Sequence, residues 1–478
     1  MKTGIVSLGA YIPYYYIERS TLVQAWGGRG GKGHRAIANS DEDSITMALE
    51  AARDALRGVD RSAVTHMFAA TTTSPYGEKS AATLISTAAN LGRKTQSVDF
   101  NSSLRCGASA LKLALDSARS AEDALICVTA ADVRNAAPKS TEEQMFGDAA
   151  AAAVVGSGNV IAEELAYACV DNEIHDYWRN ELENIVSTTE ARFMLEEGYE
   201  ASMPIAIKDA MAKAGVDSSM VSKLVVTTPD MKSHLKLAKK CGIAPEKVQD
   251  PLMTEVGCCG SAQMLLILAS AFETAQSGDI IVAAAYGSGA SAFVFRVTDE
   301  IDKWRRSTVS KYYARRAEFS DYARLMSFRG LLVPKQGEPF KIPAAPSITW
   351  REQNTYLRLE AGVCTKCGCK TFPADRICYK CRSKDCCEHV SRTEAKSKLF
   401  SFSIDRLAGR SDDPIVVQAC ADDSEGIRFY MNMTDFEENE VKIGMDLEFT
   451  FRKIHNLANL PNYYWKFRPV RFDAEGEI

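Results

Sequence analysis

Two cysteines, Cys106 and Cys259, each open the same short pattern. The first pattern reads Cys-Gly-Ala-Ser-Ala-Leu and the second reads Cys-Gly-Ser-Ala-Gln-Met. Each is followed by an apolar helix-like stretch, a polar break and a strand-like run, at residues 124–131 and 279–285. A thiol at the start of each of two repeated helices predicts a duplicated half-domain with a catalytic pair at its pseudo-twofold axis.

Cys106 stands at a predicted helix N-terminus, a position that suits a thiol that carries an acyl group. Cys106 lies between the strand-like run 97–100 and a helix. The free N–H groups and the dipole of a helix N-terminus favour a thiolate. The same amides can hold an oxyanion on an acyl group attached to the sulfur. The alternative is a buried structural cysteine, as we expect for Cys127 and Cys169, and the duplication favours catalysis.

Four further cysteines have the spacing of a metal site. Cys364-x-x-Cys367 and Cys378-x-x-Cys381 form two knuckles separated by ten residues. Four thiolates with no open position suit a structural zinc ion. A rubredoxin-like iron site is the alternative, because it uses the same ligands. We expect the nearby metal-ligating side chains to be unliganded: Cys369, Cys386, Cys387 and His389.

Composition excludes several classes of function. The chain has 478 residues and a net charge of −5, without a broad basic region of the kind that binds nucleic acid. No apolar run approaches the roughly 20 residues that span a bilayer. The first ten residues are too short an apolar run for a signal peptide and read as a strand. Fourteen cysteines without an export signal indicate a reducing, cytoplasmic setting in which thiols serve catalysis or metal binding.

The first part of the chain alternates strand-like and helix-like segments, as an α/β domain does. Residues 43–56 have apolar side chains at helical spacing. The repeat also extends beyond the cysteines, because the segment 60–75 resembles the segment 217–229, each with a Thr-rich turn after a strand. Residues 301–333 are predicted to be helical and basic, either as a solvated helix or as an anion site for a nucleotide phosphate.

The remaining chain is predicted to form separate units. Residues 334–352 are proline-rich and form a linker after the catalytic domain, which spans residues 1–333. A cysteine-rich unit, residues 353–390, forms a zinc ribbon. Short strand-like runs in residues 391–478 have the spacing of a small β-barrel of the OB type. The aromatic residues near its end either cover an acyl chain or fill the barrel core: Tyr463, Tyr464, Trp465 and Phe467.

The first domain resembles the thiolase superfamily, and within it the archaeal type of the 3-hydroxy-3-methylglutaryl-CoA (HMG-CoA) synthase family. The C-terminal unit is similar to the zinc-ribbon/OB-fold proteins that accompany such enzymes, by Pro373 and residues 444–451. This resemblance implies a five-layer αβαβα fold, a CoA thioester substrate, acylation of Cys106 and a homodimer or higher homo-oligomer. It rests on these segments of the first domain: Asp41–Met47, Cys106, Ala131–Asp132, Phe146–Ala149, Asp176–Arg179, Tyr286–Ala290 and Asp321–Gly330.

This chain departs from that family at its acid/base positions. Where the family has a glutamate the chain has Thr72, and where the family has a histidine the chain has Thr227. The loop that holds the family's active-site asparagine is shorter here, so that Cys258 or Cys259 takes its place. An aldol-type condensation needs an acid/base for the developing alkoxide, a role that threonine does not fill.

A second cysteine is our candidate for the missing acid/base, as in thiolases. Cys258 or Cys259 would move a proton to or from the carbon or the CoA sulfur, and Thr227 would position a water or the thioester carbonyl. Packing is the alternative role for both thiols. Weaker candidates for a relocated acid or base are His234, His175 and Glu255. Gly287 and Ser288, in the glycine turn 286–290, are expected to line the pocket with Thr72 and to offer an amide to the oxyanion.

The sequence therefore predicts an acyl-CoA C-acyltransferase that cleaves or forms a 3-oxoacyl-CoA. One alternative is an HMG-CoA synthase or similar condensing enzyme with an unrecognised acid. Another is a non-catalytic scaffold, or an OB protein that binds nucleic acid. The tail has many acids and no dense basic surface, which speaks against nucleic acid. We expect the tail to complete the acyl or CoA pocket, or to hold subunits together.

Overall fold

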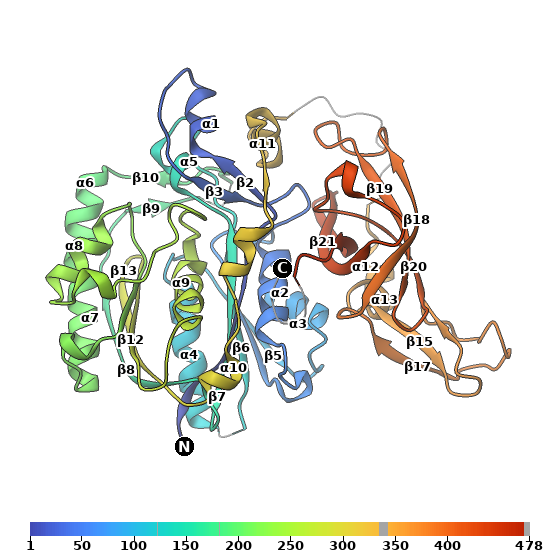
Figure 1. Ribbon diagram of the computed structural model, residues 1–478, viewed down its shortest axis with the longest axis horizontal. Coiled ribbons are helices and arrows are strands. Elements are labelled where there is room, and N and C mark those ends of the chain that lie inside the picture. The colour runs from blue at the N-terminus through green and yellow to red at the C-terminus, as the bar shows by residue number, and fades with distance from the viewer. Residues whose placement is uncertain (122, 181, 334–342, 473–478) are drawn as a thin grey trace.

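A computed structural model describes residues 1–121, 123–180, 182–333 and 343–472, and its centre is a nine-stranded sheet (Figure 1). Strands β1 and β7, and β7 and β6, pair antiparallel, whereas β6, β4 and β5 are parallel. These five strands form the first half of the sheet in the spatial order β1 (Thr3–Tyr11), β7 (Ala149–Ser157), β6 (Ile126–Asp132), β4 (His66–Ala70) and β5 (Gln96–Phe100).

The second half repeats this pattern strand for strand. β8 pairs antiparallel with β13, β13 with β12, and β12 is parallel to β11. An isolated parallel bridge between Leu224 and Val248 stands where β5 stands in the first half. β1 and β8 join the halves through the pairs Gly4–Glu163 and Ile5–Ala162. The predicted duplication is confirmed by these strands: β8 (Ala162–Asp171), β13 (Gly289–Val297), β12 (Ile280–Tyr286) and β11 (Lys223–Val226).

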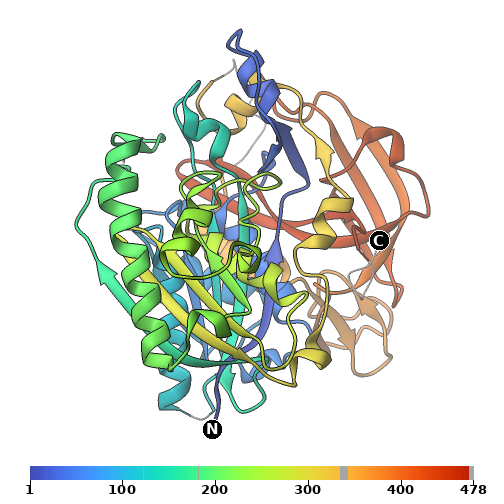
Figure 2. The same cartoon turned by 60° about the vertical axis from the view of Figure 1, so that its left-hand side comes forward.

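Helices form three layers around the two halves of the sheet, which gives the five layers predicted (Figures 1 and 2). The two cysteine helices, α4 (Cys106–Ser120) and α9 (Gln263–Phe272), contact each other in the middle layer. Every residue of α9 except Ser270 is buried, as its apolar composition requires. The outer layers hold α2 (Ser44–Ala55) and α3 (Ala81–Ala88) on one side, and α7 (Glu200–Ala214) and α8 (Ser233–Lys240) on the other.

The predicted helix at residues 43–56 is α2, and its start is fixed by a capping box. The Asp43 carboxylate accepts hydrogen bonds from the amides of Ile45 and Thr46, and the Thr46 hydroxyl accepts one from the Asp43 amide at 2.9 Å. Almost the whole helix is buried. A helix in an outer layer normally exposes one face to water, but here the C-terminal unit covers that face.

The shorter elements that connect the main strands and helices include two small sheets, β14–β2–β3 and β10–β9. They comprise β2 (Tyr15–Glu18), α1 (Arg19–Gln24), β3 (His34–Ile37), α5 (Thr141–Met145), β9 (Tyr177–Trp178), β10 (Ser187–Thr188), α6 (Ala191–Phe193), α10 (Ile301–Trp304), β14 (Ala317–Glu318), α11 (Tyr322–Phe328), α12 (Pro346–Arg351) and α13 (Gln353–Tyr356), with short 3-10 or π turns η1 (Arg61–Ala63), η2 (Met194–Tyr199), η3 (Ser218–Met220), η4 (Pro245–Lys247), η5 (Gly260–Ala262), η6 (Ser310–Ala314) and η7 (Glu438–Glu440).

The prediction of a solvated basic helix over residues 301–333 is wrong. The segment folds as the short elements α10, η6, β14 and α11. Its arginines donate to acceptors of the protein, although Arg305 and Arg324 keep exposed surface. Arg306 donates to the Ser7 hydroxyl and the Leu8 carbonyl, and Arg316 pairs with Glu255. These charges attach an irregular segment to the surrounding fold, and the alternative role of the arginines as an anion site stays a prediction.

The C-terminal unit contains a small sheet and a five-stranded sheet. The small sheet has the order β16–β15–β17, formed by β15 (Glu360–Cys364), β16 (Lys370–Thr371) and β17 (Cys387–Ser391). In the larger sheet the edge strands β20 and β22 approach each other through a bridge between Met433 and Phe467, which curls the sheet into a barrel. Its spatial order is β20 (Arg428–Asn432), β19 (Val416–Asp423), β18 (Lys396–Asp405), β21 (Asp446–Leu457) and β22 (Leu460–Pro469).

Three of the four C-terminal aromatic residues fill the barrel core, whereas Tyr464 lies on the opposite face of β22, against Tyr356. Trp465 and Phe467 on β22 have no exposed surface, and Tyr463 is 4% exposed. Their side chains alternate with less buried ones along the strand, as one face of a sheet requires. Of the two roles considered for these residues, the structure supports the barrel core and not the cover of an acyl chain.

Buried charges hold the barrel against the α2 layer. The fully buried Arg452 pairs with Glu42 at 2.7 Å and with Asp435 at 2.5 Å. Arg468 pairs with Glu50 at 2.9 Å, and both side chains are at most 9% exposed. These contacts join β21 and β22 to the start and middle of α2, so the two units form one continuous structure.

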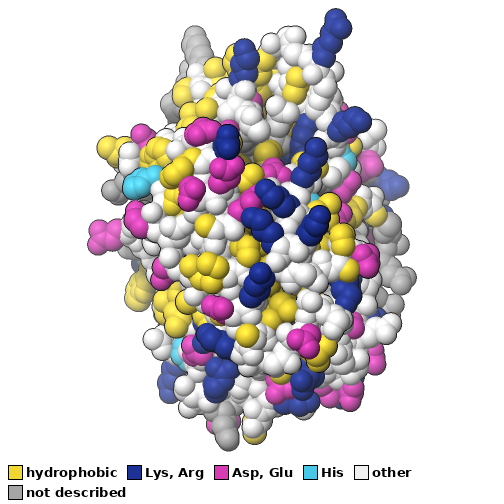
Figure 3. All heavy atoms as spheres, turned by 90° about the vertical axis from the view of Figure 1, so that its left-hand side faces the viewer, with side chains coloured by type: hydrophobic (Ala, Val, Ile, Leu, Met, Phe, Trp, Pro, Cys, Tyr) yellow, Lys and Arg dark blue, Asp and Glu magenta, His cyan; other side chains and the backbone are white. Residues whose placement is uncertain are grey.

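Part of the predicted linker, residues 334–342, lies outside the described residues. Helices α12 and α13 follow it and precede the ribbon, whose predicted boundaries at residues 353–390 and 391–478 stay a prediction. Within the described chain, no helix combines the length and the apolar character needed to cross a membrane. On the face formed by α7 and α8, basic side chains are interspersed with acidic and hydrophobic ones (Figure 3).

Candidate active site between the cysteine helices

Cys106 is the first residue of α4 and lies where the two repeated halves meet. Its amide donates to the Ser103 carbonyl at 3.0 Å, and its side chain is almost fully buried. A Cβ on the next residue, Gly107, would lie 2.4 Å from the Ser261 carbonyl oxygen of the other half. Only glycine permits this approach, which brings the starts of the two cysteine helices into contact.

The buried carboxylate of Asp132 joins the two halves at this point. One oxygen accepts hydrogen bonds from the Thr72 amide at 2.6 Å and from the hydroxyls of Thr71 and Thr73. The other oxygen accepts from the Ser261 amide at 2.7 Å. Asp132 thus fixes the Thr-rich turn of one half against the helix start of the other.

Burial determines the state of the Cys106 thiol. Burial raises the pKa of Cys106 above its usual value, and the charge of Asp132 raises it further. The Ser261 hydroxyl and the amides of Cys106 and Gly107 oppose this shift without cancelling it. The substrate-free enzyme therefore holds Cys106 as a thiol, so its proton must leave when the sulfur attacks.

The neighbouring cysteines of the second loop have different environments. The Cys258 amide donates to the Met145 carbonyl at 2.7 Å, and its side chain is half-buried. Cys259 has no exposed surface, and burial raises its pKa strongly. Its sulfur lies 3.4 Å from the Gly257 carbonyl. Cys258 is thus the accessible thiol of the pair, although Cys259 occupies the position equivalent to Cys106 in the repeat.

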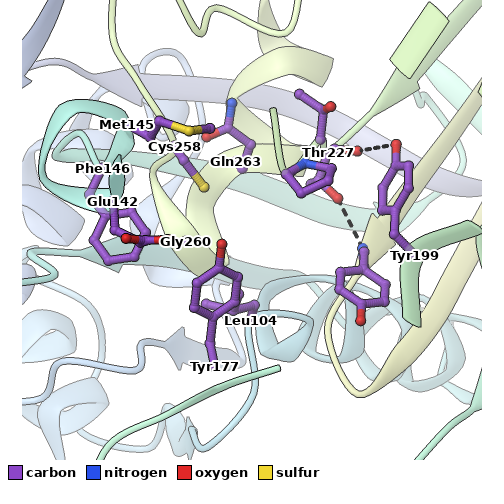
Figure 4. A pocket seen from close by; sticks show the side chains of 13 residues that line it. Leu104, Glu142, Met145, Phe146, Tyr177, Tyr199, Thr227, Cys258, Gly260 and Gln263 are labelled. Atoms are coloured by element: carbon purple, nitrogen blue, oxygen red, sulfur yellow. Dashed lines mark hydrogen bonds between the residues drawn. The ribbon is translucent and has the colours of Figure 1, made fainter. Parts of the chain in front are cut away.

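A narrow cavity of about 40 Å³ lies beside this loop (Figure 4). Among the predicted site residues, Cys258 and Thr227 line it, whereas Cys106, Cys259, Thr72, Gly287 and Ser288 do not. The cavity reaches Leu104, two residues before Cys106, and Gly260, one residue before Ser261. Its complete lining is Leu104, Glu142, Met145, Phe146, Tyr177, Tyr199, Thr227, Thr228, Pro229, Cys258, Gly260, Gln263 and Tyr286.

Two hydrogen bonds fix Thr227, one to its hydroxyl and one to its backbone carbonyl. Its hydroxyl accepts a hydrogen bond from the Tyr286 amide at 2.9 Å, and its carbonyl accepts one from the Tyr199 hydroxyl at 2.8 Å (Figure 4). The hydroxyl keeps its own hydrogen, which can be donated to a bound water or carbonyl oxygen. Thr227 can therefore position a ligand but is not an acid/base near neutral pH.

The glycine turn packs directly on the loop before Cys106. A Cβ on Gly287 would lie 2.8 Å from the Arg105 amide nitrogen, and the Gly287 carbonyl accepts from the Arg105 side chain at 3.1 Å. The Gly287 amide donates to the Gly289 carbonyl at 2.9 Å. Ser288 is exposed at the tip of the turn. This turn supports the Cys106 loop, but the Gly287 amide is already engaged and is not free for an oxyanion.

The weaker acid/base candidates lie elsewhere. His234 is buried on α8, where burial lowers its pKa. His175 is largely exposed. Burial would raise the pKa of Glu255, but its hydrogen bonds to Arg316 and His34 outweigh it and lower the pKa. None of the three lines the cavity.

Sequence reasoning missed three polar residues of this region. Glu142 contributes the cavity's carboxylate, and Tyr177 contributes a phenol whose pKa is raised by burial. Arg134 lies against Phe146 and Tyr177, with its guanidinium carbon 3.8 Å and 5.1 Å from the two ring centres. Glu142 shortly precedes the Phe146–Ala149 motif, and Arg134 shortly follows Ala131–Asp132. The only sequence signal for either residue is therefore its nearness to one of these motifs.

The four predicted metal ligands come together in the ribbon. The sulfurs of Cys364, Cys367, Cys378 and Cys381 all lie within 4.8 Å of one another. The closest pairs, Cys364–Cys381 and Cys367–Cys378, are each separated by 3.6 Å. This all-thiolate set could hold a metal ion with tetrahedral preference, and it offers no open position for catalysis. Among the spare thiols, Cys386 lies closest, 3.4 Å from the Cys364 sulfur.

Comparison with known proteins finds a matching family model and several similar enzymes. Residues 211–297 match the family model described as 3-oxoacyl-[acyl-carrier-protein (ACP)] synthase III C terminal. The chain is 31% identical to the hydroxymethylglutaryl-CoA synthase of Caldivirga maquilingensis, over 63% of this chain and 89% of that protein. It is 30% identical to the enzyme of the same name from Pyrococcus furiosus, over 67% of this chain and 94% of that protein.

Solved structures share the fold. MvaS in complex with 3-hydroxy-3-methylglutaryl coenzyme A superposes with a TM-score of 0.61 at 16% identity, covering 72% of this chain and 94% of that one. The 3-oxoacyl-[acyl-carrier-protein] synthase III of Aquifex aeolicus gives a TM-score of 0.55 at 22% identity, covering 62% of this chain and 99% of that one. The predicted fold class is confirmed by these likenesses.

Proposed function

Since the chain belongs to the hydroxymethylglutaryl-CoA synthase family, we propose that it is an acyltransferase that acts on CoA thioesters through an acyl group on Cys106. Its reaction is thiolase-like cleavage of a 3-oxoacyl-CoA, or the reverse Claisen condensation. The first turn of α4 supplies amides next to the sulfur, which is where the oxyanion of an acyl transfer develops.

The observation that carries this proposal is the position of Cys258. It lines the cavity between the two halves. The resemblance of the sequence implies that Thr72 and Thr227 stand where family members have a glutamate and a histidine. In the cleavage direction Cys106 attacks the 3-oxo carbon and its proton is relayed through Cys258 to C2 as the bond between C2 and C3 breaks. The acetyl-CoA so formed leaves, and CoA then takes the acyl group from Cys106 as the CoA thiol proton returns through Cys258 to the Cys106 sulfur.

HMG-CoA synthesis is the second candidate, and Glu142 is the observation that favours it. This half-buried glutamate on α5 contributes a carboxylate to the cavity, where the condensation needs an acid/base. It would replace the family glutamate that is Thr72 in this chain. The relatives' shared name supports the same assignment.

A matched pair of adjacent cysteines separates these candidates. Turnover is measured with 3-oxoacyl-CoA plus CoA, and separately with acetyl-CoA plus acetoacetyl-CoA, for the wild type, Cys258→Ser, Cys259→Ser and Glu142→Gln. The thiolase proposal expects thiolysis that falls by about 10²-fold or more in Cys258→Ser, as loss of a general acid/base does. Cys259→Ser serves as the control that keeps the rate. HMG-CoA formation that Glu142→Gln abolishes and Cys258→Ser leaves intact would instead establish the second candidate.

We also propose that the four ribbon cysteines hold a structural zinc ion. A tetrahedral all-thiolate donor set is typical of structural zinc, and the ribbon is otherwise a three-stranded sheet with little apolar core of its own. The ion would stabilise the ribbon and take no part in acyl transfer. One equivalent of zinc in a colourless protein is the expected analysis, and a coloured iron protein is the result that contradicts it.

We further propose that two copies of this chain associate as a homodimer or higher homo-oligomer. β5 is an edge strand of the nine-stranded sheet, and its residues are exposed or half-buried. An unpaired edge of this kind can bind the same strand of a second copy. Light scattering during size-exclusion chromatography tests this: a mass of about 52 kDa, that of the single chain, would contradict it.

A further inference from the structure

Arg134 differs from the other buried arginines in having no oxygen acceptor. Six other arginines of the described chain are at most 8% exposed, and each donates to a carboxylate or a backbone carbonyl: Arg19, Arg35, Arg392, Arg452, Arg468 and Arg471. Arg134 is 3% exposed, and its acceptor among the described residues is the Cys258 sulfur, 4.0 Å from Nη1. Its Nη2 has no hydrogen-bond partner.

The guanidinium is confined by the walls of the cavity. It stacks on the Phe146 ring and lies near the Tyr177 ring, and both rings line the cavity together with Cys258 (Figure 4). From the other side, a Cβ on Gly260 would lie 2.8 Å from the Arg134 Cδ. These contacts hold the planar group in place and keep water from it.

A buried charge without a partner costs several kcal/mol, which is why such groups are normally paired. No Asp or Glu oxygen of the described residues lies within ion-pairing distance of Arg134. The partner is therefore expected to come with the ligand that enters the cavity. The walls of the cavity are mainly apolar and aromatic, which suits an acyl chain better than the phosphate groups of CoA. A carboxylate on such a chain has two oxygens that match the fork of a guanidinium.

We propose, building on the acyl transfer proposed above, that Arg134 binds a carboxylate on the acyl group. The substrates would then be CoA thioesters whose acyl part carries a second carboxyl group. Arg134 lies directly behind the lining residues Phe146 and Cys258, so the carboxylate would reach it past these side chains. Glu142, which does line the cavity, has the opposite charge and limits how strongly a second anion binds. Its removal in Glu142→Gln is expected to strengthen the preference for a carboxylate-bearing chain.

Two acyl chains of the same length test this. Succinyl-CoA and butyryl-CoA both carry four-carbon acyl groups, and only the first ends in a carboxylate. Acyl-enzyme formation in the wild type should favour succinyl-CoA by roughly tenfold or more, as expected for a hydrogen bond between charged groups. Arg134→Met should lose this preference, and Arg134→Lys should keep part of it. Equal rates with both chains in the wild type overturn the inference and leave the proposed function intact, whereas acylation by no acyl-CoA would remove the proposed function itself.

Thermal unfolding distinguishes a binding role from a structural one. Since Arg134 has no partner, Arg134→Met should unfold at the same or a higher temperature than the wild type. The matched control is Arg35→Met, which removes an equally buried arginine whose Nη1 donates to the Phe146 carbonyl at 2.8 Å, and it should unfold at a lower temperature. Succinyl-CoA should raise the unfolding temperature of the wild type and not that of Arg134→Met. Destabilisation of Arg134→Met comparable to that of Arg35→Met would overturn the inference.

Discussion

Asp132 and Ser261 lie 129 residues apart in the sequence, and the carboxylate of the first accepts a hydrogen bond from the amide of the second at 2.7 Å. Each belongs to a different repeat of the duplicated domain. The bond therefore sets how the two cysteine helices face each other, and with them the proposed nucleophile and the loop that holds Cys258.

Replacing Asp132 should have opposite effects on stability and on thiol reactivity. In Asp132→Asn the buried amides of Thr72 and Ser261 lose a charged acceptor, which should lower the free energy of unfolding by about 2–4 kcal/mol. The same change removes a charge that raises the pKa of Cys106. Cys106 should then react faster with iodoacetamide at pH 7. Unchanged alkylation would show that Asp132 does not act on the thiol.

The substrate-free enzyme should alkylate slowly at Cys106 near neutral pH. Because burial raises the pKa of this thiol above its usual 9.0, the thiolate fraction keeps growing as the pH rises past 9. The rate of carbamidomethylation, followed by peptide mass spectrometry, should therefore increase without a plateau between pH 7 and pH 9. Cys169 is exposed, so its prediction as a buried cysteine is wrong, and it provides an internal control in the same digest. A plateau below pH 8 would contradict the protonated state inferred for Cys106.

The docking of the barrel on α2 should weaken in acid. Burial alone would raise the pKa of Glu50, but Arg53 and Arg468 outweigh burial and hold that pKa at about 2 instead of 4.5. A lowered pKa adds stability above pH 4.5, and this contribution is lost as the pH falls toward 2. The shift corresponds to roughly 3 kcal/mol. The difference in unfolding free energy between the wild type and Glu50→Gln should thus be largest at pH 7 and shrink below pH 4.5; a difference independent of pH would refute this.

Metal binding should depend on the four clustered thiols and not on the spare one on β17. Cys378→Ser removes one of the clustered sulfurs, whereas Cys387→Ser changes a cysteine of β17 outside the cluster. The first should lose bound zinc and lower the temperature at which the ribbon unfolds, and the second should retain one equivalent. Equal loss in both variants would mean that the ligand set is larger than these four sulfurs.

The duplication and the layer order could be predicted from the sequence because both repeats keep their local signals. The Cys-Gly pattern, the Thr-rich turns and the apolar runs of α9 and β12 are all short-range features. The sequence does not predict strand β22, although it identifies the aromatic residues of this segment. Whether Trp465 and Phe467 are buried depends on the rest of the barrel, which a local pattern does not show. The segment 301–333 was misjudged for the same reason, since its arginines find their acceptors on distant elements.

The candidate site was only partly accessible to sequence reasoning. The thiols and the threonines were identified by type and position, but the choice between Cys258 and Cys259 needed the fold, which buries one and exposes the other to the cavity. Arg134 and Glu142 carry no motif of their own. Their relevance follows from side chains brought together across the two halves, and a one-dimensional pattern does not record that proximity.

The measurement that tests the central claim most directly is the location of the acyl group. The protein is incubated with a 3-oxoacyl-CoA, quenched in acid, digested with pepsin and examined by mass spectrometry. We predict an added acyl mass on the peptide that contains Cys106, absent from Cys106→Ala and formed more slowly in Cys258→Ser, because that variant lacks the group that protonates C2. An acyl mass that persists on the Cys106→Ala protein, or that is found on Cys258 in the wild type, would contradict the account.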